Sequence, residues 1–204
     1  MKFWCNRGTV RRRPAFVFRG REQKPAFWKM QHPLQLIDPQ PRYETAYRDF
    51  LADYQASGEK LIPFVLRFDC SDFSAYLEQL RGFSQGIDVP ETFGPHSTFW
   101  LLAGNSQITG VINIRHRLTD AMRRIGGHIG YGVAPKFRGQ GYATAMLALA
   151  LEPARQLGIE RALITCWKEN EASAKVALHN GAVFESEELI EGAWLQRYWL
   201  HTGA

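Results

Sequence analysis

The sequence has little cysteine and no pattern that would bring its few cysteines together. Three cysteines, Cys5, Cys70 and Cys166, lie far apart among 204 residues, and none belongs to a C-x-x-C pair. This odd, widely spaced set argues against a disulfide framework and against a zinc site. We therefore expect a reduced, cytoplasmic protein that holds no metal.

Long apolar runs, internal repeats and low-complexity tracts are also missing. No stretch of about 18 apolar residues occurs, so the sequence predicts no membrane-spanning helix and no membrane partner. What the chain does have is a hydrophobic fraction of 45% spread over 204 residues. That composition and length are typical of one globular domain with a substantial core.

The net charge of +5 is concentrated at one end of the chain. Residues 1–33 hold nine Lys or Arg and one acidic residue, Glu22, so residues 34–204 are mildly acidic. We expect residues 1–33 to be a loosely attached basic extension, in which Met30 could be an alternative start, and residues 34–204 to form a single domain. An arm that binds nucleic acid or a membrane surface is the alternative interpretation, although we expect neither partner.

Residues 127–148 combine a short strand, a glycine loop and a helix in a way that favours anion binding. Residues 128–133 are β-favouring, and Pro135 ends that strand because proline cannot donate to a ladder. A helix that begins with glycines exposes unpaired N–H groups and the positive end of its dipole. The loop is neither the G-x-x-x-x-G-K-[ST] of a P-loop nor the G-x-G-x-x-G, with an acidic residue about 20 residues on, of a dinucleotide fold, so neither of those sites is predicted.

The same stretch resembles a known family. Val133-x-Pro135 followed by Arg138-x-x-Gly141-x-Ala143 is similar to motif A of the GNAT (N-acetyltransferase) superfamily, in which Arg or Gln precedes x-x-Gly-x-Gly/Ala. The resemblance implies that acetyl-CoA is the co-substrate, with its pyrophosphate on the loop amides, its acetyl oxygen near the motif strand and its arm beside the next helix. The implied cofactor-binding residues are Val133, Arg138, Gly139, Gln140, Gly141, Tyr142, Ala143, Asn170 and Ser173. The alternative role for Asn170 and Ser173 is to cap the helix that begins there.

Hydrophobic periodicity predicts an α/β (α+β) fold of order β-α-α-β-β-β-α-β-α-β-β with a mixed, mostly antiparallel sheet, and this is the GNAT order. The resemblance further implies that the motif strands splay apart. Expected strands are 35–37, 98–103, 108–115, 128–133, 161–166, 182–190 and 193–201, and expected helices are 42–55, 73–82, 141–157 and 170–181. Residues 61–68 are expected to be extended and residues 118–125 to form a loop. Pro153 should kink the helix at 141–157 or end it early.

The catalytic groups depart from the family's usual pattern. A tyrosine that serves as general acid in many members is replaced here by Ala177, and no glutamate lies between residues 121 and 136. His128 and Tyr131 are the polar side chains of the motif strand, with ordinary pKa values of about 6.5 and 10, and are the candidate catalytic base and acid. The alternative is that each is a sheet residue with a satisfied polar tip.

Two functions follow from these residues. The first is an acetyl-CoA-dependent N-acetyltransferase that moves the acetyl group directly to a primary amine of a small molecule or peptide in a ternary complex. The second is a non-catalytic acyl-CoA-binding or regulatory module of the same fold, which the missing tyrosine and glutamate favour. The acidic body slightly favours a cationic acceptor, and the chain is expected to be a monomer or a homodimer.

Overall fold

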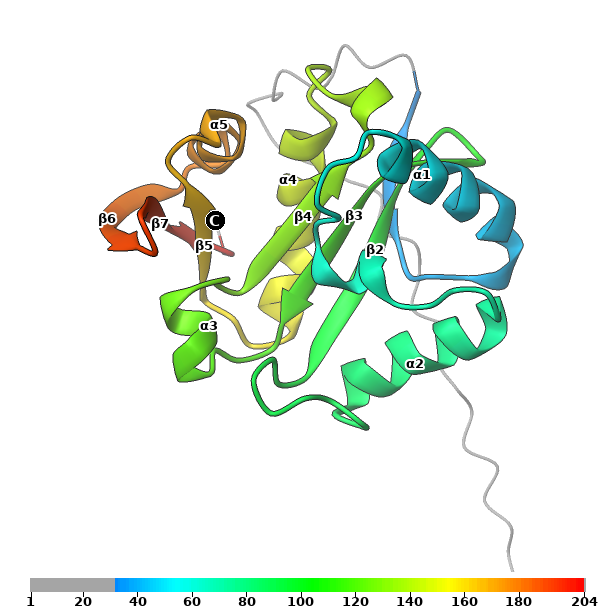
Figure 1. Cartoon of the computed structure of the whole chain (residues 1–204), viewed down its shortest axis with the longest axis horizontal. Helices are drawn as coiled ribbons and strands as arrows, with labels where there is room; N and C mark the ends of the chain where they lie inside the picture. The colour runs from blue at the N-terminus through cyan, green and yellow to red at the C-terminus, as the bar shows by residue number, and fades with distance from the viewer. Residues whose placement is uncertain (1–31, 204) are drawn as a thin grey trace, which may run out of the picture.

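The computed structural model describes residues 32–203, and it divides their strands between two antiparallel sheets. The first sheet has the order β1-β2-β3-β4 and the second has the order β5-β7-β6 (Figure 1). Their bounds are β1 Leu34–Ile37, β2 His96–Ala103, β3 Gln107–Arg115, β4 Ile129–Val133, β5 Arg161–Trp167, β6 Val183–Ile190 and β7 Ala193–His201. The expected basic extension, residues 1–33, lies almost wholly outside the described residues.

Helices cover both faces of the first sheet. The helices in residues 32–203 are α1 Glu44–Ala56, α2 Phe73–Gln85, α3 Asp120–Arg124, α4 Tyr142–Gln156 and α5 Glu171–His179, and the 3-10 turns are η2 Pro41–Tyr43, η3 Phe64–Arg67 and η4 Pro135–Phe137. A Cβ on Gly132 would touch Tyr54 of α1, whereas one on Gly110 would touch Met146 of α4. Because Gly110 pairs with Val133, the neighbour of Gly132, these two contacts lie on opposite faces. Helices α1 and α4 therefore sandwich the sheet.

An aromatic layer holds α1 and α2 against β2. The ring of Tyr47 stacks on Trp100 with centroids 4.8 Å apart, and its hydroxyl lies 2.6 Å from that of Tyr76. Each of these three side chains is at most 1% exposed. Burial of such large rings is the main source of stability here, and the shared hydroxyl contact satisfies both polar tips.

The predicted α/β fold class is confirmed and the predicted order matches in part. In place of the expected mixed sheet, residues 32–203 form two separate antiparallel sheets, and four further places need correction. Residues 61–68 contain the turn η3 and are not a strand, and the expected loop at 118–125 contains α3, capped by the hydroxyl of Thr119. Helix α2 passes Gly82 and ends at Gly86, because only Gly86 takes the left-handed conformation that closes it. Helix α4 runs through Pro153 to Gln156, so the expected early end is wrong.

The described part of the chain also bears on two broader questions. Among residues 32–203, no helix is long and apolar enough to cross a membrane. Within the same residues, no three His, Cys, Asp or Glu side chains are grouped so that they could hold a metal ion.

Candidate active site

The edge strands β4 and β5 meet at one end and separate toward the other. His128 donates its N–H to the carbonyl of Leu163 at 2.7 Å, and Gly126 donates to the hydroxyl of Thr165 at 3.0 Å. Beyond these contacts no ladder joins the two sheets in residues 32–203, and the strands diverge away from α3 (Figure 1). A Cβ on Gly127 would lie 2.4 Å from the Leu163 carbonyl oxygen, so this close approach requires glycine. The backbones of β4 and β5 therefore form a V, and we call the space between the two unpaired strands the V-shaped gap.

One edge of β4 turns its backbone toward this gap. Ala134 donates to Thr109 of β3 at 3.2 Å, and the His128 carbonyl accepts from Arg115 of β3 at 2.8 Å. Because hydrogen-bonding residues alternate along an antiparallel strand, Tyr131 and Val133 direct their N–H and carbonyl groups away from β3. Their N–H groups are thus available to a chain that enters between β4 and β5.

The loop between η4 and α4 presents a row of unpaired amides. Gly139 and Gly141 have φ angles of 72° and 87°, which are left-handed values that favour glycine. Within residues 32–203, no acceptor bonds to the N–H groups of residues 139–144, and the first helical bond runs from Ala145 to Gly141. The N–H of Arg138 is already used, since it donates to the Pro135 carbonyl at 3.2 Å. Of the loop amides expected to bind pyrophosphate, those of Gly139, Gln140, Gly141, Tyr142 and Ala143 are therefore free.

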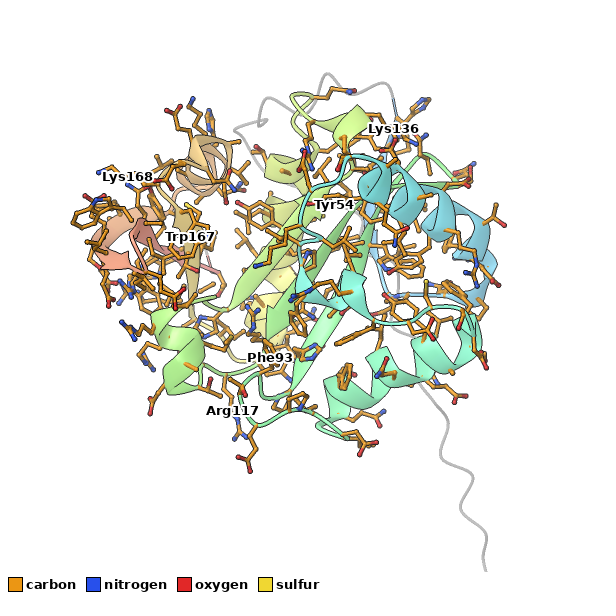
Figure 2. The ribbon with its side chains drawn as sticks, in the orientation of Figure 1. Tyr54, Phe93, Arg117, Lys136, Trp167 and Lys168 are labelled. Carbon is orange, nitrogen blue, oxygen red and sulfur yellow. The ribbon has the colours of Figure 1, made fainter. Side chains whose placement is uncertain are left out.

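The side chain of Arg138 points back toward α1 and not along the loop. Its Nε donates to the Val133 carbonyl at 3.0 Å, its Nη1 pairs with Glu59 at 2.7 Å, and its Cζ lies 5.3 Å from the centre of the Tyr54 ring. Figure 2 shows Tyr54 on the α1 side of β4, with Trp167 at the end of β5 across the gap. The Arg138 guanidinium lowers the pKa of Glu59 below its ordinary value. Arg138 thus fixes the end of β4 to the segment after α1.

Two of the predicted site residues meet at the gap. The hydroxyl of Tyr131 lies 3.0 Å from the Ser173 hydroxyl and donates to the Ser173 carbonyl at 3.2 Å. Burial raises the pKa of Tyr131 well above its ordinary value, so the phenol stays protonated and is able to donate. Asn170 caps α5 by accepting the Ser173 N–H at 3.1 Å, which is the capping role anticipated from the sequence.

His128 lies at the closed end of the V, apart from that pair. It is 9% exposed, and its Nδ1 accepts the N–H of Leu163 at 2.9 Å. Burial, aided by the charges of Arg123 and Arg115, lowers the pKa of His128 to about 4, so the ring is neutral near pH 7. Tyr131 is three residues further along the strand, which is roughly 10 Å away.

Sequence reasoning overlooked a close contact behind β4. A Cβ on Gly132 would lie 1.9 Å from the carbonyl oxygen of Ile62, and one on Gly130 would lie 3.7 Å from Pro63. The segment between α1 and η3 therefore rests directly on the motif strand. The alternation Gly130-Tyr131-Gly132 was the available signal, since two glycines on one strand face indicate a backbone approaching closely. Ala177, at the usual tyrosine position, is fully buried in α5.

Comparisons with known proteins agree with this geometry. Among solved structures, RimJ from Mycobacterium smegmatis in complex with CoA-disulfide superposes with a TM-score of 0.61 at 21% identity, covering 83% of this chain and 82% of the other. RimL, a ribosomal alpha-N-protein acetyltransferase in complex with coenzyme A, gives 0.60 at 18%, with coverage of 84% and 95%. The microcin self-immunity acetyltransferase MccE, in complex with acetyl-CoA and AMP, gives 0.57 at 18%, with coverage of 84% and 93%. These likenesses show a shared fold.

The family itself is identified from the sequence. No curated protein matches the chain. A family profile described as "Acetyltransferase (GNAT) domain" matches residues 44–183, which include α1, the V-shaped gap and the glycine loop. That match covers more than half of the chain, and the resemblance drawn from motif A is confirmed. The chain belongs to the GNAT acetyltransferase family.

Proposed function

We propose that this protein is an acetyl-CoA-dependent N-acetyltransferase that transfers the acetyl group directly to a primary amine within a ternary complex. The observation that carries the proposal is the combination of an open V between β4 and β5 with free amides at residues 139–144. These amides and the N-terminus of α4 would bind the pyrophosphate, since a helix start attracts anions. The arm would then run along β4, with Asn170 and Ser173 beside it.

The N–H groups of β4 supply the electrostatic part of the mechanism. The amine nitrogen attacks the thioester carbonyl carbon, and the carbonyl oxygen becomes negative. The N–H of Val133 or Tyr131, directed into the gap, would stabilise that oxygen as a fixed dipole. When the tetrahedral intermediate collapses, the carbon–sulfur bond breaks, the amide product forms and CoA leaves as a thiolate.

Tyr131 is the proposed acid for the departing thiolate. Its hydroxyl is held by Ser173, and because burial raises its pKa it is protonated at neutral pH but is a weak acid. It would donate a hydrogen bond to the leaving sulfur and pass on its proton only as it takes one from solvent. This arrangement compensates for Ala177, which has no proton to give.

His128 is the candidate base, but its one basic nitrogen is occupied. Nδ1 accepts the Leu163 N–H, so the neutral ring carries its hydrogen on Nε2 and takes a proton only at Nδ1, by giving up that bond. A pKa of about 4 also makes it a weak base. We therefore propose that a water molecule takes the proton that the amine nitrogen loses and passes it to solvent, and that His128 mainly closes the base of the V. For a primary amine with a pKa of about 10, roughly one molecule in a thousand is neutral at pH 7. This fraction is enough for a slow attack of the amine nitrogen on the thioester.

The acceptor is proposed to be a small-molecule or peptide amine. RimL is named for acetylating a protein's alpha-amino group, and its similar fold supports including peptide N-termini among the acceptors to be tested. We also propose a cytoplasmic protein, acting as a monomer or homodimer, without nucleic acid. Calorimetry of the full chain with acetyl-CoA tests the proposal, and a lack of binding would refute it.

A second function is favoured by one observation, the absence of a proton donor at Ala177. In this alternative the chain binds acyl-CoA without turning it over and serves as a regulatory module. An acetyl-CoA consumption screen over small amines, amino acids and peptides distinguishes the two functions. CoA binding with no turnover across the panel would favour the regulatory module.

A further inference from the structure

Three polar side chains are buried together on the first sheet, and nothing in the proposed mechanism uses them. His96 of β2 lies opposite Arg115 of β3 in the ladder, and Asn113 is two residues from Arg115 on the same sheet face. His96 is 1% exposed, Asn113 is fully buried and Arg115 is 6% exposed. We call these three residues the β2–β3 polar cluster.

Some polar atoms of the cluster form hydrogen bonds, and these bonds identify which atoms donate and which accept. Asn113 Nδ2 shares its two hydrogens among three acceptors: His96 Nδ1 at 2.9 Å, the Thr98 hydroxyl at 3.0 Å and the Ser97 carbonyl at 3.2 Å. Since an amide nitrogen only donates, His96 Nδ1 accepts and the neutral ring carries its hydrogen on Nε2. The Nη1 of Arg115 donates to the carbonyls of Gly126 and Gly127 at 3.1 and 2.9 Å.

Three atoms of the cluster have no partner. They are Arg115 Nε, His96 Nε2 and Asn113 Oδ1, all buried. No acidic side chain in residues 32–203 forms an ion pair with Arg115. Buried polar groups are nearly always hydrogen-bonded, and a buried charge without a counter-ion is strongly unfavourable. Arg115 Nε–H and His96 Nε2–H are free donors on neighbouring strands, and one of them is cationic, which is the chemistry that binds a carboxylate.

A pair of phenylalanines covers the cluster. The ring of Phe64, in η3, lies 5.1 Å from the His96 ring and 5.4 Å from Arg115 Cζ, and it stacks on Phe93 at 4.4 Å. Both phenylalanines are only partly buried, so they lie between the cluster and solvent. They belong to η3 and to the segment before β2, so their rings are able to move aside without breaking a sheet hydrogen bond. Their apolar cover would strengthen any charge pairing beneath them.

We propose that the β2–β3 polar cluster is a subsite for a carboxylate of the acceptor molecule. That the carboxylate belongs to the acceptor rests on the proposed transferase function, whereas the binding of a carboxylate does not. Arg115 lies beside His128, which is about 10 Å along the strand from Tyr131 and about 16 Å from Val133. An acceptor that reaches both points is extended, with roughly three to five peptide-like residues between its amine and its carboxylate. A free α-amino acid is too short.

Carboxylate binding is tested on the full chain without acetyl-CoA. The protein, labelled with 15N and 13C, is titrated with sodium propionate and, separately, with propionamide, which has the same shape and no charge. We expect the Nε–Hε signal of Arg115 to shift saturably with propionate, with a dissociation constant on the order of millimolar. Propionamide should leave the signal in place. Gly141→Glu, altered only in the CoA loop, should bind propionate as the wild type does.

Variants separate this site from general charge effects. Arg115→Lys should weaken propionate binding at least about ten-fold, because lysine lacks the Nε–H and the planar fork. Arg117→Lys is the matched control, since Arg117 is exposed and points away from the molecule in Figure 2, and its binding should stay within about two-fold. If Arg115→Lys does not fold, the Arg115 Nε–Hε signal is assigned in the wild type by through-bond correlation. The propionate titration of the wild type then tests the carboxylate site without the variant. No shift with propionate, or an equal shift with propionamide, overturns the carboxylate site.

The acceptor part has its own measurement. Two four-residue peptides that end in an amide and differ only in Asp or Asn at position four are compared in the acetyl-CoA consumption assay. We expect a KM at least about ten-fold lower for the Asp peptide, and no difference in Arg115→Lys. Equal KM values for the two peptides in the wild type would overturn the proposal that the acceptor supplies the carboxylate. If the protein binds propionate but turns over neither peptide, the transferase function is refuted and the carboxylate site is not.

Discussion

Replacing Gly141 by glutamate separates cofactor binding from folding. Gly141 caps α4 with a φ of 87°, where a residue with a Cβ is strained by about 1–2 kcal/mol. A carboxylate at a helix N-terminus recovers about 0.3–1 kcal/mol. The net loss of about 1 kcal/mol should lower Tm by roughly 2–4 °C for a domain of this size.

The effect on acetyl-CoA should be much larger. A glutamate in this loop would bring its charge to about 4 Å from the pyrophosphate, and at an effective dielectric of about 20 that repulsion is about 4 kcal/mol. The dissociation constant should therefore rise about a thousand-fold. Titration calorimetry measures this change, and differential scanning calorimetry of the same sample measures Tm.

Gly158→Glu is the matched control. Gly158 has a φ of 79°, and a Cβ there would meet nothing within 4 Å, so the backbone strain is similar. It follows the C-terminus of α4, about 22 Å from the loop and more than two Debye lengths away at physiological salt. The Gly158→Glu variant should lose stability but keep its affinity for acetyl-CoA. Wild-type affinity in Gly141→Glu, or equal losses in both variants, would refute the role of the loop.

Three further predictions follow from side chains around β4. Tyr131→Phe should lower kcat about a hundred-fold or more while the acetyl-CoA affinity measured by calorimetry stays unchanged, and an unchanged kcat would remove Tyr131 as the acid. Arg138→Ala should reduce the free energy of unfolding in urea by about 1–3 kcal/mol, because the Val133 carbonyl loses its partner, whereas Glu59→Gln should lose less than about 1 kcal/mol; equal losses would contradict this. Since burial lowers the pKa of His96 and His128 to about 4, the unfolded chain binds protons that the folded chain does not, so stability should fall between pH about 6.5 and 4; a flat unfolding free energy over that range would contradict both shifts.

Most of the fold could be predicted from local signals in the sequence. The strand–loop–helix around Gly141, the cap at Asn170 and the hairpins β2–β3 and β6–β7 are each encoded within a few neighbouring residues, and the structure has them where the sequence predicts them. The stop at Gly86 was missed because Gly82 and Gly86 look alike in a sequence, and only the backbone angle tells them apart. Helix α4 tolerates Pro153 because buried neighbours such as Ala150 and Ala154 hold the helix against the sheet.

The site was harder to foresee, because its decisive contacts join residues that are distant in sequence. The pairing of Tyr131 with Ser173 depends on the angle between β4 and β5, and no local pattern encodes that angle. The same holds for the β2–β3 polar cluster. Strand periodicity places His96 and Arg115 on β2 and β3, but only the register brings the two side chains opposite one another.

The packing behind β4 implies that cofactor and acceptor sides are mechanically linked. The Ile62 carbonyl rests on Gly132, and Arg138 joins the end of β4 to Glu59, three residues before Ile62. A single short segment after α1 therefore touches the motif strand from one side while the proposed cofactor arm would lie along its edge. Because interiors are close-packed, a shift of that segment cannot leave β4 unmoved. Acceptors that displace η3 should accordingly alter the affinity for acetyl-CoA, and by thermodynamic linkage acetyl-CoA should alter theirs by the same factor.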